Sequence, residues 1–269
     1  MSYIGEQGYL QILKDVLEHG EDRMDRTGVG TRMLPQAVIE FDLENSFPLI
    51  TTKKVFFKGV VHELLWMLKG DSNIQYLTEH GVHIWDEWAD QNGDLGPIYG
   101  VQWRKWETMD GRRVDQIQDV IKSLKASPFS RRHLVSAWNA GEIEQMHLPP
   151  CHYAFQFTIF KDKLNCHFNM RSNDLFLGAP FNFASYALLC YMIAHLIGRK
   201  PGKLFYTAAD SHIYSNHIEQ VREQLARTPL DPPKLEIVRN VSSIDDFKYE
   251  DFKLIDYKSH AKIEAPIAI

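Results

Sequence analysis

The chain has 269 residues, of which 44% are hydrophobic and 24% charged, and its formal net charge is -5. This composition is typical of a packed globular protein and excludes extended disorder and a small disulfide-stapled fold. The mild negative charge gives no overall attraction to DNA or to anionic membranes, so local arginines must hold any anionic ligand.

The three cysteines, Cys151, Cys166 and Cys190, show no CxxC or Cys/His zinc spacing. An odd count without such spacing favours free thiols in a reducing cytosol and predicts no metal site. The longest apolar stretch, from Tyr186, is too short to span a bilayer, and the first residues lack the pattern of a signal peptide. We therefore predict a cytoplasmic protein without membrane or DNA contacts.

The first 114 residues begin with a helix and end in an irregular stretch. Apolar residues at helical spacing predict a helix over 9–17, and the polar, glycine-containing residues 21–31 indicate a loop. A strand over 36–43 and a buried helix over 59–70 follow. Residues 71–114 are rich in Trp, Asp, Gly and Asn with weak periodicity, so we predict short helices and surface loops around a site.

The middle of the chain contains an antiparallel hairpin pattern. A helix is predicted over 115–126 and a strand over 134–139. The runs 152–160 and 163–172 both alternate and are joined by a short connection, which is typical of a hairpin. A core helix over 181–198 follows.

The last part of the chain predicts a strand over 203–210 and a helix over 213–225, ahead of a proline pair. We find no repeat and no low-complexity linker. The pattern as a whole predicts an α/β (α+β) fold with one domain over residues 1–269. In this fold, helices cover a single mixed, predominantly antiparallel sheet.

Cys151 follows two prolines and directly precedes the strand predicted from residue 152. A thiolate is a good nucleophile, but an ordinary thiol, with a pKa of about 8.5, is mostly protonated at neutral pH and needs a positive neighbour. A cysteine in an apolar chain is more often an inert core thiol, and Cys166 and Cys190 keep that interpretation. The adjacent His152 is not a suitable base, because neighbours on a strand point to opposite faces.

Four arginines lie in connections or at a strand end: Arg26, Arg131, Arg132 and Arg171. Taken singly, they fit solvated or carboxylate-paired surface arginines. As a set, with Ser172 as a hydroxyl donor, they predict a site for a dianionic phosphate. One of them is also a candidate for lowering the pKa of the Cys151 thiol.

Several polar or aromatic residues stand in apolar surroundings. Glu63 either faces solvent or faces the core, where burial would raise its pKa and suit it to proton transfer. Asn182 either caps a helix or reads a pyrimidine edge with its donor and acceptor. The tryptophans either fill the core or stack on a flat heterocycle; they include Trp85, Trp88, Trp103 and Trp106.

A series of motifs resembles the folate-dependent thymidylate synthase family. They are DRTGVGT, FPLITTKK, HELLWMLKGDSNI, IWDEWAD, GPIYGVQWR, SRRHLVSAWN, LPPCHYAFQF, RSNDLFLGAPFN, DSHIYSNH and APIAI. The resemblance runs almost end to end and is specific because of their order and spacing. It implies the thymidylate synthase fold, a homodimer, and reductive methylation of dUMP to dTMP. The co-substrate would be 5,10-methylenetetrahydrofolate, which leaves as dihydrofolate, and no metal would be needed.

The resemblance also implies roles for residues at the nucleotide. Cys151 would attack C6 of the uracil, Glu63 would organise water and proton transfers, and Tyr99 would assist removal of the C5 proton. Asn182 would bind the uracil edge and Asp174 would bind the pterin, and both would also belong to the catalytic residues. The phosphate would be held by Arg26, Arg171 and Ser172, with Arg131 and Arg132 from the partner subunit, and the sugar 3′-hydroxyl by His212 and Tyr214.

A second group would hold the folate. Its surface would comprise Ile84, Trp85, Trp88, Leu148, Leu177, Gly178 and Phe181. Lys53 would lie near the glutamate tail, and the C-terminal residues Ala268 and Ile269 would close over the site. Closure excludes water from the reacting methylene group.

Three positions depart from the usual pattern of the family. Met170 stands where glutamine is usual, Ala179 where a larger aliphatic residue is usual, and Ala209 where glycine is usual. Tolerated packing changes would explain them. A sharper alternative is a changed product, in which water replaces hydride and dUMP becomes 5-hydroxymethyl-dUMP, as in deoxynucleotide hydroxymethylases. A third hypothesis, a nucleotide- or RNA-binding protein without turnover, fits poorly with a full set of catalytic residues.

Overall fold

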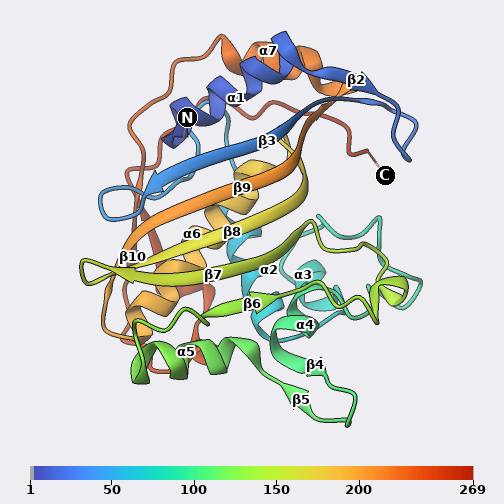
Figure 1. Cartoon of the computed structure of the whole chain (residues 1–269). Helices are drawn as coiled ribbons and strands as arrows, with labels where there is room; N and C mark the ends of the chain where they lie inside the picture. Colours follow the sequence, from blue (N-terminus) through green and yellow to red (C-terminus); the bar gives the residue numbers. More distant parts are fainter. Residues whose placement is uncertain (1–2, 269) are drawn as a thin grey trace.

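The computed structural model describes residues 3–268, and Ile269 lies outside them. Its main sheet has the strand order β1-β3-β9-β8-β7-β6, with β2 paired to β3 off this path (Figure 1). The strands are β1 (Tyr3–Ile4), β2 (Glu21–Arg23), β3 (Thr31–Asp42), β6 (Leu134–Ser136), β7 (His152–Phe160), β8 (Lys163–Asp174) and β9 (Lys200–Tyr214). The pairs β1/β3 and β8/β9 are parallel and the other pairs antiparallel, which confirms the predicted mixed sheet.

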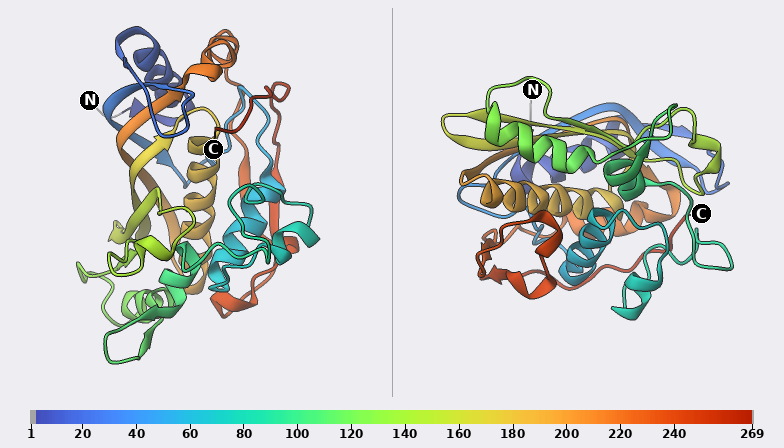
Figure 2. Two further views of the ribbon diagram at one scale, coloured as in Figure 1. Left: turned by 90° about the vertical axis from the view of Figure 1, so that its right-hand side faces the viewer. Right: turned by 90° about the horizontal axis from the view of Figure 1, so that it is seen from below.

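The helices cover the sheet mainly from one side. They are α1 (Gly5–His19), α2 (Phe57–Leu68), α3 (Gln75–Glu79), α4 (Tyr99–Lys105), α5 (Gln116–Ala126), α6 (Gly178–Leu196) and α7 (Ile218–Leu225). α6 crosses one face of the sheet, and α2 lies behind α6 (Figure 2). On α6, Tyr186 stacks on Phe168 of β8 with ring centroids 4.3 Å apart. Because the sheet and α2 enclose α6, it is apolar on nearly all sides.

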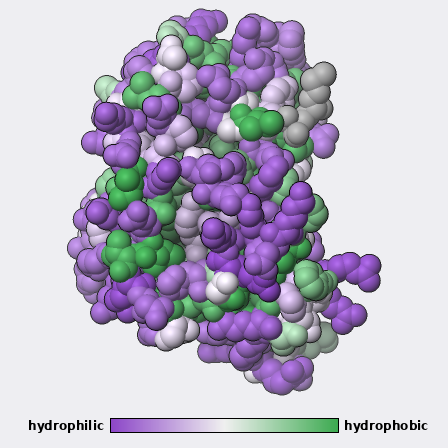
Figure 3. Space-filling model, turned by 90° about the vertical axis from the view of Figure 1, so that its left-hand side faces the viewer, coloured by the Kyte–Doolittle hydropathy of each residue, from purple (hydrophilic) through white to green (hydrophobic). Residues whose placement is uncertain are grey.

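Smaller elements complete the chain. They are the strand pairs β4 (Trp106–Glu107) with β5 (Arg113–Val114) and β10 (Lys234–Ile237) with β11 (Phe252–Ile255), and the 3₁₀ helices η1 (Ile143–Gln145), η2 (Ser215–His217), η3 (Ile244–Asp246) and η4 (Tyr249–Asp251). Hydrophilic residues dominate the surface in Figure 3, with apolar ones in separate groups. None of the helices within residues 3–268 has the length and apolar character that crossing a membrane requires.

Local signals predicted several elements well. Asp115 caps α5, because its carboxylate accepts a hydrogen bond from the backbone N–H of Gln118 at 3.0 Å. The hairpin of β7 and β8 also forms as predicted, with Phe157 opposite Cys166. In both places the periodicity of neighbouring residues agrees with the final packing.

Other predicted boundaries were wrong because pairing with strands far away in the chain determines where the element begins or ends. The predicted loop over 21–31 contains β2, whose three exposed residues pair with β3. The strand predicted over 134–139 ends at Ser136. The helix predicted over 213–225 starts only at Ile218, since Ile213 and Tyr214 continue β9 by pairing with β3.

The ends of β8 and β9 place polar side chains beside the apolar core. Even-numbered residues of β8 face α6, and they change from buried Phe168 and Met170 to half-buried Ser172 and Asp174. β9 changes in the same way after Ala208. Since β8 and β9 run in parallel, both polar ends lie at the same edge of the sheet.

Candidate active site

Cys151 lies immediately before β7 and is half-buried, whereas Cys166 and Cys190 are fully buried. The guanidinium of Arg171 lies 3.8 Å from Cys151 Sγ. That guanidinium is held by the carbonyls of Pro150 at 2.9 Å and Pro149 at 2.8 Å. The two prolines therefore orient the charge that faces the thiol.

The pKa of the Cys151 thiol is raised above its ordinary value, and burial is the main cause. The charges of Arg171 and Arg26 act in the opposite direction and lower this pKa. The expected influence of a neighbouring arginine is therefore present, but burial outweighs it. The unliganded thiol is protonated at neutral pH.

Tyr99 contacts the nucleophile from α4. Its hydroxyl oxygen accepts a hydrogen bond from the backbone N–H of Cys151 at 2.9 Å, and burial raises its pKa well above the ordinary value. The φ of Tyr99 is 26°, in the left-handed region that non-glycine residues rarely adopt. A Cβ on the next residue, Gly100, would lie 2.2 Å from the carbonyl oxygen of Met67. Only glycine permits this approach of α4 to α2.

Glu63 projects from α2 toward the same site. Its Oε1 accepts a hydrogen bond from Trp85 Nε1 at 2.8 Å. Burial raises the pKa of Glu63 to about 7, although the Trp85 bond lowers it. The charge of Glu63 also acts on the pKa of Tyr99, which places the two groups in one electrostatic environment. A carboxyl group with a pKa near neutrality is suited to proton transfer.

A second set of polar groups lies at the ends of β8 and β9. Ser172 pairs in register with Asp210, and Asp174 with His212. Asp210 Oδ1 lies 2.7 Å from His212 Nδ1. Because a carboxylate only accepts, Nδ1 of a neutral His212 carries the proton and Nε2 stays available as an acceptor. The ring of Tyr214 lies edge-on to His212 at 5.1 Å.

The charges of these groups reach the nucleophile. The pKa of Tyr214 is raised to about 12, first by burial and then by Asp174 and Asp25, while Arg26 lowers it. Arg26 is exposed, and it acts on the pKa of Cys151 as well. The fold therefore brings Arg26, Asp174 and Tyr214 to the site of Cys151.

The two remaining arginines of the predicted set are not brought there. Arg131 and Arg132 are exposed and precede β6, and neither is among the groups that shift the pKa of Cys151. The carbonyl of Arg131 accepts a hydrogen bond from Gln156 Nε2 at 3.4 Å. Among the contacts described for Cys151, neither arginine takes part.

The start of α6 gathers further predicted residues. Asp174 Oδ1 accepts from the backbone N–H groups of Phe176 at 2.8 Å and Leu177 at 3.1 Å, which fixes the turn into α6. A Cβ on Gly178 would lie 3.1 Å from Asn173 Oδ1 and 3.8 Å from both Asn182 Oδ1 and Asp174 Cβ. Glycine therefore avoids a tight contact with Asn173, and the side chains of Asn182 and Asp174 lie beside it.

The predicted folate surface consists of apolar side chains at the border of the core. Trp85 is buried and lies 5.8 Å from Trp88, edge to face. Among residues 3–268, Trp88 Nε1 finds no hydrogen-bond partner. The other apolar members are half-buried against the core: Ile84, Leu148, Leu177 and Phe181. Ala268 is half-buried too.

Lys53 is more enclosed than a residue at the mouth of a site. Its Nζ donates to the carbonyl of Phe176 and lies 3.5 Å from the centre of the Phe176 ring. Burial lowers the pKa of Lys53 to about 7, although Asp174 opposes this effect. Lys53 therefore contacts the segment between β8 and α6.

The three departures from the family pattern occupy different places. Met170 and Ala179 are buried in the core, at 2% and 0% exposure. Ala209 is exposed, and alternation along β9 directs it away from the face that carries His212. With Met170 it lines a hollow of about 310 Å³. Met170 and Ala179 are therefore the two of the three that belong to the core packing, beside Arg171 and Gly178 in the chain.

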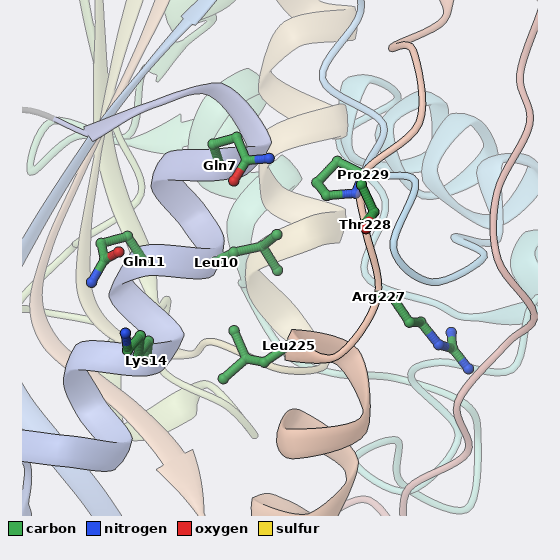
Figure 4. Close-up of a pocket in the computed structure, with 8 residues that line it drawn as sticks. All are labelled: Gln7, Leu10, Gln11, Lys14, Leu225, Arg227, Thr228 and Pro229. Atoms are coloured by element: carbon green, nitrogen blue, oxygen red, sulfur yellow. The ribbon is translucent and has the colours of Figure 1, made fainter.

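A second hollow, of about 290 Å³, lies between α1 and α7 (Figure 4). Leu10 and Leu225 face each other across it, whereas the side chain of Arg227 points away. Arg227 instead donates to the carbonyls of Thr52 at 2.8 Å and Ala261 at 2.7 Å. None of the predicted site residues lines this hollow.

The sequence interpretation missed positioning residues. His152 was correctly set aside as a base, since burial lowers its pKa to about 3, but its ring stacks on Tyr99 at 4.0 Å. Its Nδ1 shares a hydrogen bond with Tyr186 Oη at 2.8 Å. Asp210 was missed too, although its spacing of two residues from His212 on a strand was a usable signal. No local pattern reveals the stacking of His152.

Within residues 3–268, no group of three or more His, Cys, Asp or Glu side chains is placed to hold a metal ion. The arrangement instead combines a thiol, a carboxyl group of nearly neutral pKa and local positive charge. A model of the family described as thymidylate synthase matches residues 7–269, nearly the whole chain. The motifs, the fold and this match agree, and the chain belongs to the thymidylate synthase family.

Proposed function

We propose that the protein is a thymidylate synthase that converts dUMP to dTMP with 5,10-methylenetetrahydrofolate. The observation that carries the proposal is the half-buried Cys151 thiol, which faces the Arg171 guanidinium and is bonded through its backbone to Tyr99. A pure binding protein has no need of a thiol held against a cation beside a carboxyl group of pKa about 7.

The reaction begins at Cys151. The thiol gives up its proton to water, Sγ bonds to C6 of the uracil, and the electron pair of the C5–C6 double bond moves toward C5 and the C4 carbonyl. C5 then bonds to the methylene carbon of the co-substrate, and the C5 proton leaves toward the environment of Tyr99 and Glu63. As this proton leaves, the bond between the methylene carbon and the folate nitrogen breaks and frees tetrahydrofolate. Hydride from tetrahydrofolate completes the methyl group, the C5–C6 double bond re-forms, and Sγ leaves C6 and takes up a proton again. The nucleotide gains one carbon and the folate becomes dihydrofolate.

The nucleotide site combines charge with oriented acceptors. Arg26, Arg171 and Ser172 hold the phosphate, and His212 with Tyr214 holds the 3′-hydroxyl. Support comes from the bond between Asp210 and His212, which leaves His212 Nε2 free to accept from a hydroxyl. Asn182 binds the uracil edge, where its amide favours uracil over cytosine.

The folate lies against the apolar border of the core, with Asp174 at the pterin. Trp85, which is buried and bonded to Glu63, links the folate surface to the proton-transfer group. Lys53 attracts the glutamate tail, a role that requires movement from its bond to Phe176. Ala268 and Ile269 close over the site and exclude water.

The active protein is a cytoplasmic homodimer in which the partner subunit supplies Arg131 and Arg132 to the phosphate. Two observations support sharing: both arginines are exposed, and the sheet face opposite α6 carries apolar side chains such as Tyr153, 37% exposed. A second copy of the chain would cover that face.

Hybrid dimers test the sharing. Arg131→Ala and Cys151→Ser homodimers are each expected to have little activity. In an equal mixture half of the dimers contain one subunit of each kind, and one of the two sites in such a dimer has both Cys151 and Arg131 intact. About a quarter of all sites, and so up to about a quarter of wild-type activity, should therefore be regained. The measurement is dTMP formation after co-refolding equal amounts. Mixtures no more active than the two homodimers would show that each chain uses its own Arg131.

The fate of the folate tests the reaction itself. With dUMP and methylenetetrahydrofolate, we expect dihydrofolate absorbance to increase in step with dTMP measured by mass spectrometry. Formation of 5-hydroxymethyl-dUMP without dihydrofolate would replace the proposal with the hydroxymethylase alternative and make Met170 and Ala179 the first residues to exchange. Tight dUMP binding without any product would indicate a binding protein.

A further inference from the structure

The last part of the chain, residues 257–268, forms an extended segment that we name the C-terminal strap (Figure 1). Hydrogen bonds attach its first half firmly. The hydroxyl of Tyr257 donates to the carbonyl of Ile50 at 3.0 Å, and the backbone N–H of His260 donates to Thr51 at 2.8 Å. The bond from Arg227 to the carbonyl of Ala261 follows.

Within residues 3–268, one side-chain hydrogen bond joins the part of the strap beyond Ala261 to the rest of the protein. His217 Nε2 lies 2.7 Å from the carbonyl oxygen of Pro266. Because a carbonyl only accepts, Nε2 of His217 carries the proton and donates it. His217 has 0% exposure, and its Nδ1 has no partner within residues 3–268. A buried donor of fixed tautomer therefore holds the strap at Pro266, two residues before Ala268.

His217 also contacts both halves of the proposed site. Its ring lies 5.6 Å from the Tyr214 ring at the nucleotide side. It lies 5.5 Å from the ring of Phe176, which precedes α6 and contacts Lys53 on the folate side. The ring is thus packed between the two halves while its Nε2 faces the strap.

We propose that His217 is a positioning residue that holds the end of the C-terminal strap over the folate. The structural part of the inference concerns only the bond to Pro266, whereas its effect on catalysis rests on the proposed function. Loss of the donor should release the strap without removing any group that contacts the nucleotide phosphate or uracil.

Two amide variants separate the donor from the bulk of the side chain. In His217→Gln the amide nitrogen occupies the position of Nε2, whereas in His217→Asn it lies near Nδ1 and cannot reach Pro266. Both keep a polar side chain and should fold, which thermal unfolding can check. His19→Gln, on an exposed histidine with 70% side-chain exposure, controls for the substitution itself.

The direct measurement is removal of the last two residues by carboxypeptidase A, followed by mass spectrometry. With dUMP and a non-reactive folate analogue present, we expect removal about tenfold faster from His217→Asn than from wild type, and within about twofold of wild type in His217→Gln. Equal rates in wild type and His217→Asn would overturn the proposal. Equal acceleration in both variants would also overturn it, because packing rather than the donor would then be responsible.

The second measurement separates folate from nucleotide. In His217→Asn, KM for methylenetetrahydrofolate should increase about tenfold while Kd for dUMP stays within about twofold of wild type, and His217→Gln should restore KM. A parallel loss of dUMP affinity would contradict a role confined to the strap. If wild type forms no dTMP, the proposed function fails, but the carboxypeptidase rates still decide whether His217 holds the strap.

Discussion

Cys151→Ser is expected to lower turnover by about 10⁴-fold or more while the protein still binds dUMP. A serine hydroxyl is far less acidic than a thiol and a poorer nucleophile toward carbon. The geometry around residue 151 should survive, because Arg171 donates to the carbonyls of Pro149 and Pro150 and the backbone N–H of residue 151 donates to the Tyr99 hydroxyl. The measurements are single-turnover dTMP formation and equilibrium dialysis with dUMP.

A matched exchange at another cysteine provides the control. Cys190 is fully buried, and its thiol donates to the carbonyl of Leu164 at 3.4 Å. Cys190→Ser keeps a donor at this place, so it should fold and turn over like wild type. Substantial turnover by Cys151→Ser would exclude a covalent role for Cys151. Loss of dUMP binding together with turnover would instead point to a structural role.

Glu63→Gln is expected to lower kcat by about 10²- to 10⁴-fold, the range for loss of a general acid or base. Glutamine keeps an oxygen to accept from Trp85, so the loss should reflect proton transfer rather than displacement of the indole. Rates should be measured across pH 5 to 9. The control is Glu79→Gln, which makes the same substitution at an exposed position on α3. A wild-type pH profile in Glu63→Gln would contradict the assigned role.

The same variant should change stability in a pH-dependent way. Glu63 has a pKa of about 7 in the folded protein against an ordinary 4.5, so the folded state binds more protons between these values. Stability of the wild type is therefore lost as pH increases through this window, and Glu63→Gln escapes the loss. The difference corresponds to a relative gain of up to about 3 kcal/mol at pH 8 compared with pH 4. Urea unfolding of both proteins at pH 4 and pH 8 measures this gain. If the free energy of unfolding differed between variant and wild type by the same amount at both pH values, ionisation of a buried Glu63 would be contradicted.

Elements that neighbouring residues specify were predictable from the sequence. The apolar spacing of α5 and its capping Asp115 are local signals, as is the alternation along β7 and β8. The family was identifiable in the same way, because its motifs are short stretches of sequence that can be recognised, with their order, without knowledge of the fold. The family match over residues 7–269 confirmed that identification.

Tertiary packing decided what depends on distant partners. β2 has no apolar alternation and exists because β3 offers it a pairing edge, and the same strand extends β9 through Tyr214. The net rise in the pKa of Cys151 could not be predicted either, since it is a balance between burial and the charges of Arg171 and Arg26. Nor does any motif predict the contact of His217 with Pro266. These strand pairings, the pKa of Cys151 and the contact of His217 all depend on segments that lie far apart in the chain. Such segments come together and exclude water only when the chain is folded.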